Sequence, residues 1–210
     1  MGMKKIVCSV AAVISLIVGG TVTEIPISQS ETPKVEFVEL SIGKPSIDLT
    51  LNDQAIGFSD YGELLVSPRA LELIGDAEDC RLNPYVCPAG LMTDGIGNTH
   101  GVSGEVISLE QVAKDWVRNI QSAEKCLVAS MGTASMSQGH IDAFTSFIFN
   151  TGCTRFKHNR DGSETRIYKH IKNSRYTAAC HELNFWVRGG GKKLNGLIIR
   201  RAKETEICLL

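Results

Sequence analysis

Three side chains with acid, thiol and hydroxyl chemistry lie close together in residues 75–101. The carboxyl group of Glu78 is followed nine residues later by the thiol of Cys87, and six residues after that by the hydroxyl of Thr93. A carboxylic acid can transfer a proton, a thiol can act as a nucleophile or an acceptor, and a hydroxyl can hold water. Together these groups can form a hydrolytic site. We therefore treat Glu78, Cys87 and Thr93 as candidate catalytic residues.

The cysteine pattern indicates the cellular compartment in which the protein acts. The chain has seven cysteines, no Cys-X-X-Cys pair, and five histidines without a metalloprotease motif. We therefore predict no metal site and no cofactor. Behind an export signal, such cysteines form disulfides. An odd number leaves at least one thiol outside intramolecular bonds, and Cys80 is close enough in sequence to bond Cys87.

The N-terminus carries the pattern of an export signal. Lys4 and Lys5 precede eighteen uncharged residues, 6–23, and Cys8 lies inside this run. Eighteen weakly apolar residues barely cross a hydrocarbon core of about 30 Å. Three interpretations are open: a signal peptide cleaved after Gly20, a permanent anchor, or an uncleaved anchor that inserts weakly and later leaves the bilayer. We assign residues 1–23 as a signal-anchor helix.

Charge separates the rest of the chain into two regions. Residues 22–64 have a net charge of −6, and residues 65–210 have a net charge of +3. We assign residues 24–64 as an acidic tether, in which two strand-like runs, 35–40 and 47–51, predict a small hairpin. Residues 65–210 form the catalytic domain. Its basic charge suits an anionic polymer such as a bacterial cell wall, and the overall charge of −1 gives no indication of nucleic acid as a partner.

The candidate site must be positioned by a helix and a hairpin. Ser67 and Pro68 are a favourable N-cap and first-turn pair, so a helix is expected from Ser67, with Leu71, Ile74 and Ala77 on one face and Glu78 near its C-terminal end. Residues 83–98 are rich in glycine, proline and short strand-like runs, which predicts a small antiparallel hairpin.

The remainder of the catalytic domain has helical patterns. A capping box at Ser108 predicts a long helix to about residue 130, and an apolar helix over 138–150 is stopped by Gly152. Shorter helices are expected over 164–173 and 176–184. A last helix, 196–208, has an apolar face of Leu197, Ile198 and Ile207, with Arg200 and Arg201 beside it. The sum is an α+β fold, a small β-hairpin lobe followed by a larger helical lobe.

The spacing of Glu78, Cys87 and Thr93, followed by Gly95-Ile96-Gly97, resembles the active-site run of the phage-type lysozymes, glycoside hydrolase family 24. Most of that family has an aspartate where this chain has Cys87, and a subgroup has cysteine. The similarity continues through residues 143–156 and 194–204, and covers about residues 67–210. The resemblance implies a two-lobed lysozyme-like fold with the cleft between the lobes.

The resemblance also implies an activity. The family hydrolyses the β-1,4 bond between N-acetylmuramic acid and N-acetylglucosamine in peptidoglycan, with inversion. Glu78 would be the general acid, and Cys87 and Thr93 would position the water. The expected partner is the peptidoglycan glycan strand, acted on by a monomer. A lytic transglycosylase, or a wall-binding protein without catalysis, remains an alternative.

The N-terminus resembles that of the signal-arrest-release endolysins, which wait in the host inner membrane facing the periplasm and are then released to lyse the cell. Residues 6–23 would make the membrane contact. A Cys80–Cys87 bond would block the site, and Cys8, once out of the bilayer, would attack Cys80 and release Cys87. The other four cysteines, able to pair in three ways, would form two fixed bonds, for which we favour Cys126–Cys208 and Cys153–Cys180.

Overall fold

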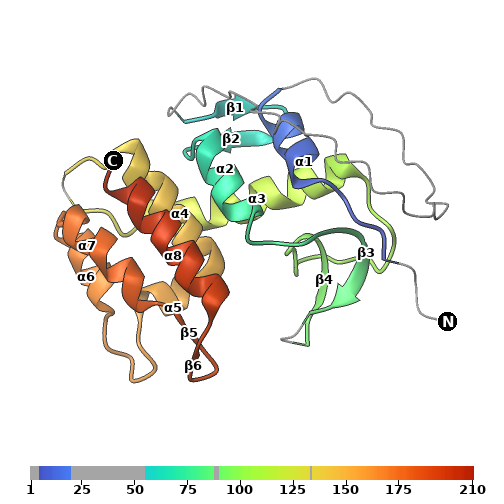
Figure 1. Ribbon diagram of the computed structural model, residues 1–210. Coiled ribbons are helices and arrows are strands. Elements are labelled where there is room, and N and C mark those ends of the chain that lie inside the picture. Colours follow the sequence, from blue (N-terminus) through green and yellow to red (C-terminus); the bar gives the residue numbers. More distant parts are fainter. Residues whose placement is uncertain (1–4, 20–54, 88–89, 133) are drawn as a thin grey trace, which may run out of the picture.

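The computed structural model describes residues 5–19, 55–87, 90–132 and 134–210. The strand-like runs 35–40 and 47–51 of the predicted tether hairpin lie outside these residues. A β-hairpin lobe and a larger helical lobe are joined by the long helix α3, Leu109–Val128 (Figure 1). Each lobe has its own buried core, one around Phe144 and Phe147 and the other around Trp116. This confirms the predicted α+β class with two lobes.

Helix α2, Pro68–Gly75, leads into the candidate site. Its N-cap is Ser67, as predicted, although the hydroxyl donates to Asp142 Oδ2 (2.5 Å) and makes no capping bond. The helix ends at Gly75, so the prediction that it carries Glu78 was wrong. The amide of Glu78 donates to the Gly75 carbonyl in the turn that follows (3.1 Å). Ala77 is correspondingly exposed, because the chain has already left the helix where the apolar face would continue.

The predicted hairpin is present as β3, Cys80–Val86, and β4, Met92–Ile96, paired antiparallel. Cys80 lies opposite Ile96, and Tyr85 lies opposite Thr93. The register shifts between Arg81 and Tyr85. This interval contains Pro84, which has no amide hydrogen to give to a partner strand. Beyond the shift, Tyr85 and Thr93 form a cross-strand pair near the turn that joins the two strands.

A second small hairpin lies in the segment that the sequence analysis assigned to the tether. Strands β1, Gly57–Ser59, and β2, Gly62–Leu64, pair antiparallel. Leu64 is fully buried in the same core as Trp116. The Gln121 side chain on α3 donates to the Glu63 carbonyl (2.9 Å). The last residues of the acidic segment therefore pack on the catalytic domain.

The helical lobe follows the predicted pattern closely. Ser108 caps α3 by accepting from the Gln111 amide, and α4, Gln138–Thr151, ends at Gly152, whose φ of 79° suits glycine. One short helix, α5, was not predicted. The remaining elements are α5 (Cys153–Lys157), α6 (Arg166–Lys172), α7 (Tyr176–Glu182), the 3-10 helix η1 (Leu183–Phe185), β5 (Arg188–Gly189), β6 (Lys192–Lys193) and α8 (Asn195–Cys208).

The buried face of α8 is ionic near its middle, which corrects the sequence prediction. Arg200 and Arg201 are buried, whereas Ile198 is 42% exposed. Both arginines pair with Glu204, which is fully buried on the next turn of the helix (3.1 and 2.6 Å). Buried charges are tolerated where they are paired and hydrogen-bonded. The arginines therefore point into the molecule, and the expected apolar face is displaced.

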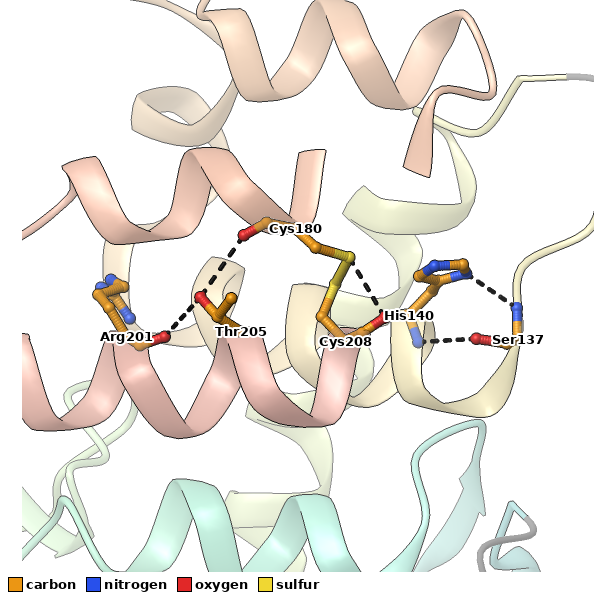
Figure 2. Close-up of a disulfide and its surroundings, with 6 residues drawn as sticks. All are labelled: Ser137, His140, Cys180, Arg201, Thr205 and Cys208. Carbon is orange, nitrogen blue, oxygen red and sulfur yellow. Dashed lines mark hydrogen bonds between the residues drawn. A yellow bond between two sulfur atoms is a disulfide. The ribbon is translucent and has the colours of Figure 1, made fainter. Parts of the chain in front are cut away.

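Three disulfides are present among the described residues: Cys8–Cys80, Cys126–Cys153 and Cys180–Cys208. All four cysteines of the helical lobe are bonded, as predicted, but the favoured pairing was wrong. Cys126 near the end of α3 meets Cys153 at the start of α5. Figure 2 shows the second bond, which ties α7 to the C-terminal turn of α8, where the Thr205 hydroxyl also donates to the Cys180 carbonyl (3.5 Å).

The N-terminal segment is folded into the catalytic domain. Helix α1, Val10–Ile17, packs on α2 and α3, and Val13 and Ile17 are fully buried there. The preceding residues run beside β3, with the Leu82 amide donating to the Ile6 carbonyl (2.9 Å) and the Cys8 amide to the Cys80 carbonyl (3.1 Å). Across the described ranges, no helix has both the length and the apolar character needed to cross a bilayer.

Candidate active site

Glu78 lies between the two lobes and is held by the helical lobe. Its side chain is 25% exposed, and Oε1 accepts from Arg200 Nη1 on α8 (3.2 Å). Arg200 is itself fixed, because it also donates to Glu204 (3.1 Å) and to the Ser146 carbonyl (3.3 Å). An arginine bound at three points offers a preorganised partner. The Glu78 carboxyl group is thereby held in one orientation with part of its surface open to solvent.

The other oxygen of Glu78 faces the turn after β4. A Cβ atom built on Gly97 would lie 3.3 Å from Glu78 Oε2, and Gly97 has a φ of +67°. This backbone conformation and this close approach both favour glycine. Gly97 therefore lets the hairpin lobe come within contact distance of the carboxyl group that the helical lobe holds.

Cys87 and Tyr85 lie near the turn that joins β3 and β4. Cys87 lies outside the three disulfides, is half-buried, and donates its amide to the Leu91 carbonyl (2.9 Å). Burial raises the pKa of the Tyr85 hydroxyl, Arg81 opposes this rise, and the negative charges of Asp79, Cys87 and Glu78 add to it, that of Asp79 most. The charges of both candidate groups therefore act on the same hydroxyl.

Thr93 lies on β4 directly across from Tyr85 and is almost completely buried. Its hydroxyl donates to the Leu91 carbonyl (3.1 Å), and the oxygen lone pairs can still accept a hydrogen bond from water. The three predicted catalytic residues therefore come from two parts of the chain, the turn after α2 and the β3–β4 hairpin with its connecting turn. No described group of His, Cys, Asp or Glu is arranged to hold a metal ion.

Asn98 organises the turn that carries Gly97. Its amide nitrogen donates to Asp94 Oδ1 (2.8 Å) and to the His100 carbonyl (3.0 Å). Its amide oxygen accepts from the His100 amide (3.2 Å) and from Asn119 Nδ2 on α3 (3.3 Å). Asp94 is 2% exposed, and burial raises its pKa. This buried amide connects the turn to the helix between the lobes.

Two hollows flank the site. One of about 560 Å³ is lined by Glu78, Asn150, Leu194, Gly196 and Arg200, among others. The other, of about 240 Å³, lies between the hairpin turn and the helical lobe and is lined by Gly97, His100, Asn119, Phe149 and Cys153, among others. Polar side chains beside an apolar ring surface are what a sugar needs for binding. Glu78 lines the first hollow, and Gly97, which approaches its carboxyl group, lines the second, so both hollows adjoin the site.

Sequence reasoning missed Arg200, Tyr85 and Asn98. Arg200 is 122 residues from Glu78, so no local pattern could connect them. Tyr85 lies two residues before Cys87 on a strand, and side chains two apart share a face, so this spacing was a usable signal. Asn98 follows Gly97 in a glycine-rich turn, where asparagine often bonds to the backbone.

Comparisons with known proteins agree with the geometry. A family model for phage lysozyme matches residues 75–204. The chain is 40% identical to the SAR-endolysin of Escherichia phage P1 over 154 residues, which are 70% of this chain and 83% of that protein. The SAR-endolysin of Haemophilus phage HP1 is 37% identical over 150 residues, covering 69% and 81% respectively.

Solved structures show the same similarity. The active form of the P1 phage endolysin Lyz matches with a TM-score of 0.67 and 31% identity, covering 97% of this chain and 95% of that one. A mutant of P22 lysozyme matches with a TM-score of 0.57 and 24% identity, covering 69% and 98%, which indicates a shared fold.

Proposed function

Since the chain belongs to the phage lysozyme family, we propose that it is an endolysin: a muramidase that hydrolyses the β-1,4 bond between N-acetylmuramic acid and N-acetylglucosamine and so lyses the host cell. The observation that carries this proposal is the position of Glu78. Its carboxyl group is fixed by buried Arg200 and lines a hollow of about 560 Å³. Glu78 protonates the leaving oxygen of the glycan.

Cys87 and Thr93 act on the water that attacks the sugar. A second group is needed on the far side of the sugar ring to orient this water. Cys87 and Thr93 belong to the hairpin lobe, whereas Glu78 is held by the helical lobe, so the groups come from opposite walls. A half-buried thiol at the hairpin end can accept a proton from water as a thiolate, and the Thr93 hydroxyl holds the water in place.

Activity is controlled by the three cysteines near the site. In the inactive form a Cys80–Cys87 bond blocks the thiol. The Cys8 thiolate attacks Cys80, the Cys8–Cys80 bond forms, the Cys80–Cys87 bond breaks, and Cys87 leaves as a thiolate. No external oxidant is needed, because one disulfide replaces another. The Cys8–Cys80 bond, with Cys87 outside any disulfide, supports this order because it corresponds to the end state.

Release of the N-terminus from the membrane starts this disulfide exchange. Residues 6–23 lie in the host inner membrane before activation, which keeps Cys8 away from Cys80. Release into the periplasm lets α1 dock on α2 and α3, and this docking brings Cys8 beside β3. The names of the P1 and HP1 relatives, both SAR-endolysins, support such an anchor.

Digestion of purified peptidoglycan tests the activity. Mass spectrometry should detect reducing-end muramic acid products, and Glu78→Gln should abolish them without changing export or folding. Anhydro-sugar products would indicate a lytic transglycosylase, and an active Glu78→Gln variant would remove Glu78 from its role. Intact binding without any cleavage by the native protein would indicate a wall-binding protein.

Substitutions of the cysteines test the control separately. Cys80→Ser should be active while still tethered, because nothing then blocks Cys87. Cys8→Ser should be released yet inactive until a reductant is added. An inactive tethered Cys80→Ser protein that becomes active on release would show that the membrane anchor, and not a disulfide, blocks the site.

A further inference from the structure

The positive charge of the catalytic domain is concentrated at one end of the helical lobe. Residues 153–193, here called the basic end, carry ten Lys and Arg against three Asp and Glu, a net charge of +7. The rest of residues 65–210 has a net charge of −4. The net charge of +3 for the whole domain is therefore the sum of a strongly basic end and an acidic remainder. A strongly basic surface attracts an anionic partner.

Nearly all of these cations face solvent. Two of the three acids are taken up in ion pairs, Glu164 with Lys172 (2.7 Å) and Glu182 with Arg166 (3.0 Å). The charge that remains is positive and distributed over α5, α6, α7 and the β5–β6 hairpin. The exposed cations are Arg155, Arg160, Arg166, Lys169, Lys172, Arg175, Arg188, Lys192 and Lys193.

Several of the cations are positioned against aromatic rings. The Lys172 ammonium lies 5.1 Å from the centre of the Tyr168 ring, and the Lys157 ammonium lies 5.8 Å from it. The Arg166 guanidinium lies 5.1 Å from the centre of the Phe185 ring, which is 66% exposed. Cation–π contacts restrict long side chains, so less conformational freedom is lost when an anion binds.

The basic end begins and ends at the walls of the cleft. Its first residue, Cys153, lines the 240 Å³ hollow, and Leu194, directly after its last residue, lines the 560 Å³ hollow. Figure 1 shows α5, β5 and β6 gathered at one end of the helical lobe, with α6 and α7 beside them. A polymer that leaves the cleft on the side of the helical lobe would pass over this surface.

We propose that the basic end is a second substrate-binding surface, which holds the carboxylates of the stem peptides that project from the glycan strand. This rests on the proposed muramidase function. Each muramic acid carries a peptide with free carboxylate groups, so an uncleaved strand presents anions at regular intervals beyond the sugars in the cleft. The basic end retains the strand between cleavage events and adds no group to the chemistry.

The test measures binding without cleavage. Full-length Glu78→Gln protein is sedimented with intact peptidoglycan sacculi, with sacculi whose stem-peptide carboxylates have been converted to neutral methylamides with a carbodiimide, and with vesicles of anionic phospholipid. Lys192→Glu/Lys193→Glu reverses two exposed charges of the basic end. Lys114→Glu/Lys125→Glu reverses two exposed charges on α3 and is the matched control. Native protein assayed for cleavage in parallel reports the proposed function independently.

The basic-end pair should weaken binding to intact sacculi about tenfold at low salt, and the control pair less than about twofold. Binding should fall as salt rises, because exposed charges are screened. Sacculi with amidated stem peptides should bind the two variants equally. If both double variants weaken binding equally, the effect depends only on the net charge of the protein, and the proposal is overturned. Undiminished binding of the native basic end to sacculi with amidated stem peptides would overturn it too, and stronger binding to vesicles than to sacculi would assign the surface to lipid.

Discussion

Gly75, the last residue of α2, should be required for docking of the N-terminal helix. A Cβ atom built on Gly75 would lie 2.3 Å from Val10 Cγ1 on α1 and 3.3 Å from Trp116 on α3. Real carbon atoms do not approach to 2.3 Å, so α1 would have to move. Val13 and Ile17, both fully buried, would lose contacts with it. Gly75→Ala should therefore disfavour the docked state of α1.

The two states of the protein should respond in opposite directions. Burial of one Val or Ile side chain contributes about 1.5–3 kcal/mol, and overpacking of a filled core costs about 1–3 kcal/mol. A shift of α1 that exposes part of two such side chains should cost about 2 kcal/mol, roughly a thirtyfold change in the docking equilibrium. With α1 undocked, alanine within a helix is about 0.5–1 kcal/mol more favourable than glycine.

Hydrogen exchange of the released protein measures this directly. Protection of the α1 amides and of the Cys8 amide should fall about thirtyfold in Gly75→Ala, while the amides of α4 keep theirs. Val10→Ala removes the clashing methyl groups, so the double variant should recover most of the loss attributable to Gly75→Ala. If Gly75→Ala lowers protection equally in the Val10→Ala background, the contact with Val10 is not the cause.

Three further predictions concern the charged and polar groups of the site and its supports. Glu124 accepts from the amides of Leu65 and Val66, and burial raises its pKa from 4.5 to about 7. The stabilisation that comes from the raised pKa is fully present below about pH 4.5 and is lost as pH rises through 7. Between pH 5 and 8, the free energy of unfolding of the native protein, measured by urea titration, should therefore fall by on the order of 2 kcal/mol relative to that of Glu124→Gln. If the two proteins show the same dependence of unfolding free energy on pH, this prediction is refuted. Arg200→Gln leaves Glu204 with one fewer cation and should cost about 3 kcal/mol, while Lys203→Gln on the same helix should cost under about 0.5 kcal/mol; equal melting temperatures would refute the network. Tyr85→Phe should lower kcat about tenfold with little change in melting temperature, and an unchanged kcat would remove Tyr85 from the site.

Local signals predicted much of the fold. Ser67, Ser108 and Gly152 each stand at the helix boundary that their side chains or backbone freedom favour, and the β3–β4 hairpin follows its glycine and proline residues. These features depend on a few neighbouring residues. The order and spacing of Glu78, Cys87 and Thr93 were likewise visible in one short stretch.

The errors arose where distant segments decide the outcome. The burial of Arg200 depends on its ion pairs with Glu78 and Glu204. Arginine is expected at the surface unless such partners are known, and the sequence alone does not identify them. The disulfide pairing in the helical lobe depends on how the helices pack, which four sequence positions do not specify. The helix before Glu78 ends early because the chain must turn toward β3.

The Cys8–Cys80 bond also changes the covalent topology of the chain. The two cysteines are 72 positions apart, so the bond closes a ring that contains α1, the acidic segment and α2. The entropy of closing a flexible ring rises only with the logarithm of its length, by about 0.6 kcal/mol for each doubling. Insertions or deletions between α1 and β1 should therefore alter folding stability very little.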